Sequence, residues 1–288
     1  MISARWLLRA ASLAAAWSLL ASAAIPAGSS GPAERLGESI AARPGSVVRW
    51  AGKGIESCGR ENRSWQPLDG SCWFPIDLLQ PEGGLRVFRY RDGLRETATI
   101  EVSEYPYPVQ RITIEDTSRV DLSPEILARV QKEQTWVKPL WSLEGPAIFA
   151  LPLADPLDEM GKSGSFGSRR FFNDQPRSPH SGADYPAVEG TPVYSVSAGR
   201  VVLAADLFFS GNSVFVDHGD GLISMYFHLS SILVEEGQEL ETRAQIGRVG
   251  ATGRTTGPHL HFGLRWKGAR VDPSLLLGPS SAIPEISG

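Results

Sequence analysis

Residues Gly253–Trp266 read GRTTGPHLHFGLRW, and this stretch decides how the C-terminal part of the chain is interpreted. Gly257-Pro258 predicts a turn, and the apolar and aromatic run after it predicts a β-strand over 259–266. Residues two apart in a strand point to the same face, so His259 and His261 should project side by side. A neutral imidazole is a preferred zinc ligand, and two on one rigid strand suit a metal site. His-x-His alone is equally compatible with two partly exposed strand histidines.

The other histidines strengthen the metal interpretation. All 5 histidines of the chain lie in its C-terminal part. The segment SPHSGAD places His180 four residues before Asp184 in a turn-rich loop, so both side chains can reach one centre. With His261 they supply two imidazoles and one carboxylate. Three protein ligands with a fourth position open to water are typical of a catalytic zinc, whereas a structural zinc is closed by four ligands. We therefore predict one Zn²⁺ ion per chain.

Two further histidines would then lie beside the metal. His259 shares a strand face with His261, and His228 lies near the end of a strand predicted over 222–229. Since zinc lowers the pKa of its bound water to about 7, hydroxide becomes available at neutral pH. His228 and His259 are placed to orient the attacking water, take its proton and stabilise the developing oxyanion. His218 sits in a tight turn, where a structural hydrogen bond is favoured over catalysis.

The rest of the chain predicts a mainly β protein. Short strands punctuated by glycine, with no periodic helix, favour an antiparallel sheet in the C-terminal part; the candidates there are 192–196, 200–205, 213–218, 222–229 and 259–266. An N-terminal β-domain of immunoglobulin-like size is predicted from strands at 47–50, 73–78, 85–91 and 94–102. Its tryptophans are interpreted as core, with a sugar-binding platform as the alternative. A connecting helix should start after Ser123, an N-cap followed by proline, and end near Lys138.

The first residues predict export. Arg5 and Arg9 precede an apolar run that ends in the small residues Ala21-Ser22-Ala23, the form that a signal peptidase recognises. The alternative is an uncleaved anchor, but the run is shorter than the roughly 20 residues that a membrane span needs. No later stretch is long enough to cross a bilayer. The net charge of −4 and the absence of a basic run argue against nucleic-acid binding.

The only two cysteines, Cys58 and Cys72, predict a disulfide. An even pair at short separation in an exported protein favours a bridge. A metal-binding pair is the alternative, but no histidine or further cysteine lies near them. The closed loop of about 15 residues would contribute roughly 3 kcal/mol in the chain-entropy picture.

Three segments together resemble the lysostaphin/LytM-type zinc endopeptidases of bacterial cell walls: SPHSGAD, VDHGDGLISMYFHLS and TGPHLHF. The resemblance covers roughly residues 160–275. It implies zinc ligands at His180, Asp184 and His261, catalytic histidines at His228 and His259, and a β-sheet groove for a peptide. It also implies hydrolysis of the peptide stems or cross-bridges of peptidoglycan. A β-domain ahead of the peptidase domain is similar to exported Gram-negative members, which implies the periplasm.

With this resemblance, the organisation is predicted as a signal peptide (1–23), a linker (24–44), an N-terminal β-domain (45–115), a helix and proline-rich connection (116–160), a LytM-type zinc peptidase domain (161–278) and a tail (279–288).

The sequence departs from the family pattern at one position, which concerns the group that stabilises the oxyanion. Several relatives place a tyrosine shortly before the first zinc ligand, whereas this chain has none there. Arg170, Asn173 and Tyr226 are the candidates for an oxyanion or substrate contact.

Two other functions are weighed against the peptidase. A catalytically silent LytM module would bind the wall or activate an amidase, but such modules lose metal ligands and this chain keeps all three. A zinc carboxypeptidase or amidase acting on the same polymer stays open. The sequence carries no signal for the oligomeric state.

Overall fold

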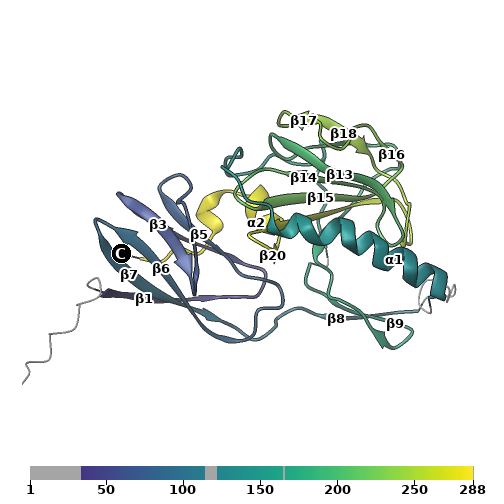
Figure 1. The fold of residues 1–288 in the computed structure, drawn as a ribbon. Coiled ribbons are helices and arrows are strands. Elements are labelled where there is room, and N and C mark those ends of the chain that lie inside the picture. The colour runs from purple at the N-terminus through teal and green to yellow at the C-terminus, as the bar shows by residue number, and fades with distance from the viewer. Residues whose placement is uncertain (1–33, 114–121, 165, 288) are drawn as a thin grey trace, which may run out of the picture. The chain divides into compact units, whose positions relative to one another are not determined.

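The computed structural model of the chain describes residues 34–113, 122–164 and 166–287, and these residues form several β-sheets and one long helix (Figure 1). The prediction of a mainly β protein is confirmed. The predicted signal peptide at 1–23 lies outside the described residues. Among the described residues, no helix is both long and apolar enough to cross a membrane.

The N-terminal part consists of two sheets that face each other across a core. The larger has the strand order β1-β7-β6-β3-β4, and the smaller pairs β2 with β5. Val48, Trp50, Phe74 and Ile100 fill the space between them, each at most 2% exposed. The strands are β1 (Glu34–Ala42), β2 (Val47–Ala51), β3 (Ile55–Arg60), β4 (Arg63–Trp65), β5 (Ser71–Pro75), β6 (Gly83–Arg91) and β7 (Leu94–Val102).

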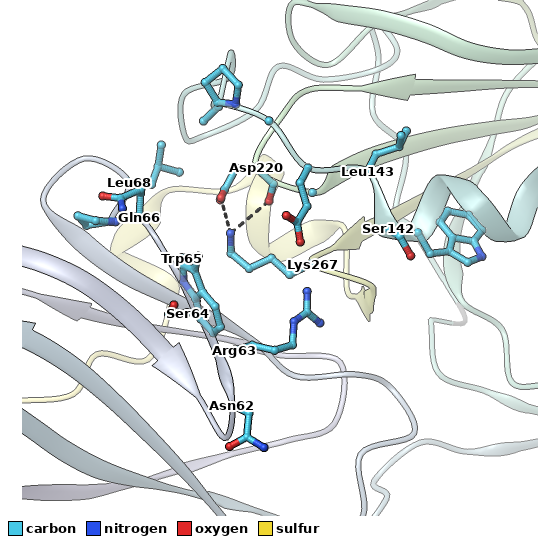
Figure 2. Close-up of a pocket in the computed structure, with 17 residues that line it drawn as sticks. Asn62, Arg63, Ser64, Trp65, Gln66, Leu68, Ser142, Leu143, Asp220 and Lys267 are labelled. Atoms are coloured by element: carbon cyan, nitrogen blue, oxygen red, sulfur yellow. Dashed lines mark hydrogen bonds and ion pairs between the residues drawn. The ribbon is translucent and has the colours of Figure 1, made fainter.

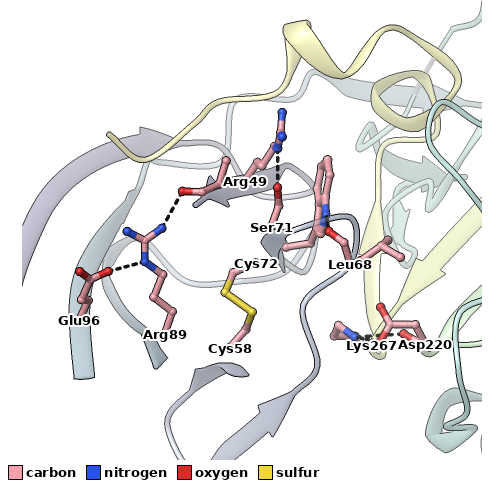
Figure 3. Close-up of a disulfide and its surroundings, with 11 residues drawn as sticks. Arg49, Cys58, Leu68, Ser71, Cys72, Arg89, Glu96, Asp220 and Lys267 are labelled. Carbon is pink, nitrogen blue, oxygen red and sulfur yellow. Dashed lines mark hydrogen bonds and ion pairs between the residues drawn. A yellow bond between two sulfur atoms is a disulfide. The ribbon is translucent and has the colours of Figure 1, made fainter. Parts of the chain in front are cut away.

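A disulfide joins the two N-terminal sheets (Figure 3). Cys58 in β3 and Cys72 in β5 are bonded, with an S–S distance of 2.05 Å, and both are fully buried. Nearby, the buried guanidinium of Arg89 donates to Glu96 at 2.5 Å and to the Ala51 carbonyl at 2.7 Å. The bridge and the hydrogen bond from Arg89 to Ala51 therefore connect the same two sheets at separate points, whereas the ion pair with Glu96 lies within the larger sheet.

Two terminal segments differ from the prediction. The linker predicted over 24–44 includes strand β1, which pairs in parallel with β7. The tail predicted over 279–288 is also anchored: Arg49 donates its N–H to the Pro284 carbonyl at 2.9 Å, and Ile286 is buried. Both segments gain their partners from remote parts of the chain, and their own residues lack a run of β-branched or aromatic side chains. Pairing rather than local propensity therefore determines their structure.

The C-terminal part is built on a seven-stranded sheet with the order β11-β19-β15-β14-β13-β17, and β20 pairs with β19. All of these pairings are antiparallel, as predicted. The strands are β11 (Gly182–Pro186), β13 (Gly199–Leu207), β14 (Gly211–Asp217), β15 (Leu222–Leu229), β17 (Glu239–Leu240), β19 (His259–Trp266) and β20 (Ala269–Val271). A second sheet has the order β12-β18-β16, with β12 (Pro192–Tyr194), β16 (Ser231–Ile232) and β18 (Gln245–Arg248).

Buried side chains connect the two β-rich parts. Trp266 of β19 packs on Trp73 of β5, with ring centroids 5.7 Å apart, and both belong to the same core cluster. By its contacts, the chain from Pro32 to Gly288 forms one compact unit. The domain boundaries drawn from the sequence stay predictions.

The connection between these parts contains the predicted helix. Helix α1 (Pro124–Val137) begins after Ser123, whose hydroxyl accepts the Ile126 N–H at 3.4 Å, and a 3₁₀ turn η2 (Lys138–Ser142) continues it. A small sheet, β10-β9-β8, precedes the peptide segment that carries His180. Its strands are β8 (Val109–Ile112), β9 (Arg169–Phe172) and β10 (Gln175–Pro176). Two short helices end the chain, α2 (Ser274–Leu277) and η3 (Ser280–Ala282).

Candidate metal and catalytic site

Three adjacent strands bring the predicted site residues together. In the register of the main sheet, His261 of β19 lies opposite Asp184 of β11 on one side and Phe227 of β15 on the other. His180 lies just before β11 and is fixed by the backbone: its N–H donates to the Ser168 carbonyl at 3.0 Å. The three side chains therefore come from strand β19, from the edge strand β11 and from the segment just before β11.

The candidate ligand atoms form a tight triangle. His180 Nε2 lies 2.9 Å from His261 Nδ1 and 3.0 Å from Asp184 Oδ1, and His261 Nδ1 lies 2.8 Å from the same oxygen. Two imidazole nitrogens and a carboxylate oxygen are ligands that zinc prefers. A tetrahedral zinc with bonds of about 2.0–2.1 Å separates its ligand atoms by about 3.3 Å, so a small outward adjustment accommodates the ion. The donor set and its spacing fit the metal.

The charges at this cluster agree with a cation site. Burial would raise the pKa of the Asp184 carboxyl, but hydrogen bonds and charge from His180 and His261 hold it well below its usual range. Burial lowers the pKa of His261 to about 4, although its hydrogen bond to Asp184 acts in the opposite direction. At neutral pH the cluster therefore presents an ionised carboxylate and a neutral imidazole, the forms that bind metals.

A glycine makes room for the His261 ring. A β-carbon built on Gly182 would lie 2.6 Å from His261 Nε2 and 2.6 Å from the Phe262 carbonyl oxygen. On the other side, Phe227 stacks on the same imidazole, with centroids 5.2 Å apart and ring planes 2° apart. The ligand ring is therefore held between a neighbouring backbone and an aromatic face. The contact of Phe227 with His261 and the need for glycine at 182 both follow from the register of the sheet and not from the sequence pattern.

His228 reaches the site through an unusual backbone conformation. It has φ of +64°, a region that few residues other than glycine adopt, although histidine is enriched there together with asparagine and aspartate. The strand register shifts at this point, and Phe227 and His228 both lie beside His261 instead of on opposite faces. The His228 ring is 4.9 Å from the His259 ring. Strained conformations of this kind cluster at active sites.

Backbone carbonyls orient both remaining histidines. His228 Nδ1 lies 2.8 Å from the Thr252 carbonyl oxygen, and His259 Nδ1 lies 2.9 Å from the Gly257 carbonyl oxygen. Because a carbonyl only accepts, each Nδ1 is assigned the proton and each Nε2 carries a lone pair. His259 Nε2 is 3.7 Å from Asp184 Oδ1, so its free nitrogen lies beside the ligand cluster.

The three candidate oxyanion or substrate contacts have different positions. Arg170 donates from Nη2 to Asp184 Oδ2 at 3.1 Å, so its guanidinium lies against the candidate ligand. Asn173 lies in the turn between β9 and β10 with φ of +48°. Tyr226 is fully buried, and its hydroxyl oxygen accepts the Val196 N–H at 3.0 Å. The suggestion that Tyr226 contacts the substrate is therefore wrong, because its side chain belongs to the core face of β15.

His218 has the structural role that its turn predicts. Its ring is fully buried, with Nδ1 2.7 Å from the Ala198 carbonyl and Nε2 2.7 Å from the Ser224 hydroxyl. Burial lowers the pKa of His218 to about 4. Both ring nitrogens are occupied by hydrogen bonds within the core.

A separate cavity of about 670 Å³ contains none of the site residues (Figure 2). It is lined by residues 62–68 of the disulfide loop, residues 141–147, and the ion pair between Lys267 and Asp220. Each of its two tryptophans lies beside a cation: Lys267 Nζ is 5.3 Å from the centre of the Trp65 ring, and the Arg265 guanidinium is 4.1 Å from the centre of the Trp141 ring.

Comparison with known proteins gives consistent results. The family model described as "Peptidase family M23" matches residues 178–273. The crystal structure of a protein assigned to peptidase M23 from Pseudomonas aeruginosa superposes on this chain with a TM-score of 0.62. The two sequences are 30% identical, and the alignment covers 82% of this chain and 94% of that one. Among curated relatives, the peptidoglycan DD-endopeptidase ShyA of Vibrio cholerae is 40% identical over 133 residues, 45% of this chain. The DD-carboxypeptidase/endopeptidase Mpg of Neisseria meningitidis is 38% identical over 106 residues, 37% of this chain.

The two curated relatives are much longer than the matched region. The alignments cover 31% of ShyA and 24% of Mpg. The five histidines and Asp184 all lie within the residues that the family model matches, whereas the N-terminal sheets and helix α1 lie outside them.

Proposed function

Because the chain belongs to peptidase family M23, we propose that it is a zinc-dependent endopeptidase that hydrolyses the peptide cross-links or stems of peptidoglycan. The observation that carries the proposal is the triangle of His180 Nε2, Asp184 Oδ1 and His261 Nδ1. His228 and His259 lie beside it, each with Nδ1 on a backbone carbonyl. A silent wall-binding module would need neither the full ligand set nor two oriented histidines.

The metal and the histidines have separate tasks in this proposal. His180, Asp184 and His261 hold one zinc ion, which when bound supplies a Lewis acid and a water of lowered pKa. Burial lowers the pKa of His228 to about 4, so its ring is neutral at pH 7 and Nε2 can accept a proton. His259 Nε2 can accept or donate a proton on the other side of the ligand cluster. These are the general acid–base roles that amide hydrolysis requires.

Arg170 and Asn173 take supporting roles. We assign Arg170 to Asp184: by binding Oδ2 it keeps Oδ1 directed at the two imidazoles, as residues around metal ligands commonly do. Gln110 supports this arrangement by accepting from Arg170 Nε at 3.3 Å. Asn173 remains a candidate contact for the substrate peptide.

The substrate and the location follow from the relatives. ShyA is named as a peptidoglycan DD-endopeptidase and Mpg as a DD-carboxypeptidase/endopeptidase, and the name of ShyA supports peptidoglycan as the substrate of this chain. Peptidoglycan lies outside the cytoplasmic membrane, so the proposed activity agrees with export to the periplasm of a Gram-negative bacterium. The name of Mpg includes carboxypeptidase activity, which makes removal of a terminal residue the second candidate reaction.

Digestion of purified sacculi, followed by mass spectrometry of the muropeptides, tests this function. We expect cross-linked dimers to decrease and the corresponding monomers to appear. His259→Ala is the matched control, because it should keep the metal and lose the activity. Loss of only a terminal residue from monomers would establish the carboxypeptidase instead. Unchanged muropeptides with zinc-loaded protein would refute both reactions.

A further inference from the structure

We propose that helix α1 positions the catalytic histidine His228, and that the buried carboxylate of Glu133 is the group through which it does so. The inference rests on the proposed function, because it takes His228 as a residue that handles the reacting proton. Helix α1 precedes residues 178–273, so the family match assigns it no role.

Glu133 binds the turn that follows strand β13. Its side chain is 10% exposed, and its two carboxylate oxygens accept the Phe208 N–H at 3.1 and 3.0 Å. Arg129, one helical turn earlier, donates from Nε to Glu133 at 2.6 Å and from Nη2 to the Asp206 carboxylate at 3.1 Å. A buried carboxylate is unfavourable unless it is paired and hydrogen-bonded. The hydrogen bonds of Glu133 therefore hold the backbone of the turn after β13, although Glu133 itself lies in helix α1.

The same turn holds the backbone of the catalytic residue. The Ser210 carbonyl accepts the His228 N–H at 2.8 Å, and the Phe209 carbonyl accepts the Arg254 N–H at 2.8 Å. The second bond anchors the loop whose Thr252 carbonyl binds His228 Nδ1. Residues 208–210 therefore hold His228 directly through its amide and indirectly through its ring.

This support matters because of the conformation that His228 adopts. A non-glycine residue with φ of +64° persists only where its surroundings determine it. The amide bond to Ser210 is one of these constraints. If the turn relaxes, His228 can return toward an ordinary strand conformation, which would direct its ring away from His259 and His261.

The test compares two substitutions of similar size at Glu133. Glu133→Met removes both acceptors of the Phe208 N–H, whereas Glu133→Gln keeps one. Arg129→Gln is a control that removes the ion pair and leaves the carboxylate on Phe208. With zinc-loaded protein and cross-linked muropeptides, we expect kcat of Glu133→Met to fall about ten-fold or more, since small misplacements of catalytic groups are costly. KM and zinc content should change little, and the other two variants should stay within about three-fold of the parent.

Hydrogen exchange supplies a measurement that does not depend on activity. In Glu133→Met, amides in peptides covering 206–212 and 225–230 should exchange faster, while those covering 259–266 should not change. Unchanged exchange at 225–230, or an equal loss of kcat in Glu133→Gln, would overturn the proposal. If the Glu133→Met protein does not fold, the role of Glu133 is in stability alone, and this result would overturn the proposal as well. If no form cleaves muropeptides, the proposed function fails, and the exchange experiment still decides whether α1 restrains His228.

Discussion

The ring of His261 occupies the space that a side chain at Gly182 would need. A β-carbon at residue 182 would meet His261 Nε2 at 2.6 Å and the Phe262 carbonyl at the same distance. Neither atom can move freely, because His261 is stacked on Phe227 and Phe262 is paired within the sheet. The approach of β11 to β19 at this point therefore depends on the missing side chain.

Gly182→Ala should damage the metal site without altering any ligand. We expect a loss of about 1–3 kcal/mol in stability from overpacking and a zinc affinity about 10–100-fold lower, because His261 loses its orientation. Calorimetry and zinc titration measure the two effects. Gly161→Ala is the matched control, since a β-carbon there meets only the Pro186 carbonyl, at 3.7 Å. If both variants bind zinc like the parent, the close approach is unimportant.

Removing a candidate ligand should remove the metal. Asp184→Ala and His261→Ala each delete one corner of the triangle and should bring bound zinc well below one ion per chain, with loss of hydrolysis. Elemental analysis of dialysed protein gives the stoichiometry. Full zinc occupancy in either variant would show that the ligands lie elsewhere.

His228→Ala and His259→Ala should separate the chemistry from the metal. Both rings lie beside the ligand cluster and outside its triangle, so zinc should remain bound. Loss of acid–base assistance should lower kcat by about 10²–10⁴-fold. Single-turnover rates on a cross-linked muropeptide measure this loss. Near-normal rates in both variants would exclude these residues from the mechanism.

The buried His218 should make folding stability sensitive to acid. Burial lowers its pKa to about 4 in the folded chain, compared with about 6.5 when unfolded. Between these values only the unfolded state binds the proton, so stability is full above about pH 6.5 and is lost as the pH falls toward 4, by about 3 kcal/mol.

A comparison of the parent with His218→Gln isolates this contribution, because the other histidines titrate in both proteins. The stability advantage of the parent in urea unfolding should shrink between about pH 7 and about pH 4. An advantage that is independent of pH would mean that the pKa of His218 is the same in the folded and unfolded states.

The strands with continuous apolar sequence could be predicted from the chain alone. The strands predicted at 222–229, 259–266, 85–91 and 94–102 are confirmed by the structure, and the last two pair with each other. Strand β1 could not be predicted, because its partner β7 lies more than fifty residues away and its sequence ERLGESIAA has little β propensity. Strand β11 was also missed, since its short sequence GADYP depends on pairing with β19.

The candidate site was also predicted from the sequence only in part. The spacing of His180, Asp184 and His261 was enough to predict a cluster, because each motif lies on a short segment with one orientation. Residues two apart in a regular strand share a face, but Tyr226 and His228 of β15 do not. The positive φ of His228 breaks that alternation, so Phe227 and His228 face the site and Tyr226 faces the core. A single sequence does not indicate where a strand departs from its regular twist.

Reconstitution with zinc tests whether the cluster of His180, Asp184 and His261 holds the metal that hydrolysis requires. Protein stripped by a chelator and dialysed should not cleave cross-linked muropeptides, and stepwise addition of Zn²⁺ should restore cleavage in proportion to bound metal. We expect a plateau at a single equivalent of zinc per chain, because the cluster of three ligands binds one ion. Full cleavage by metal-free protein, or no cleavage at full occupancy, would contradict it.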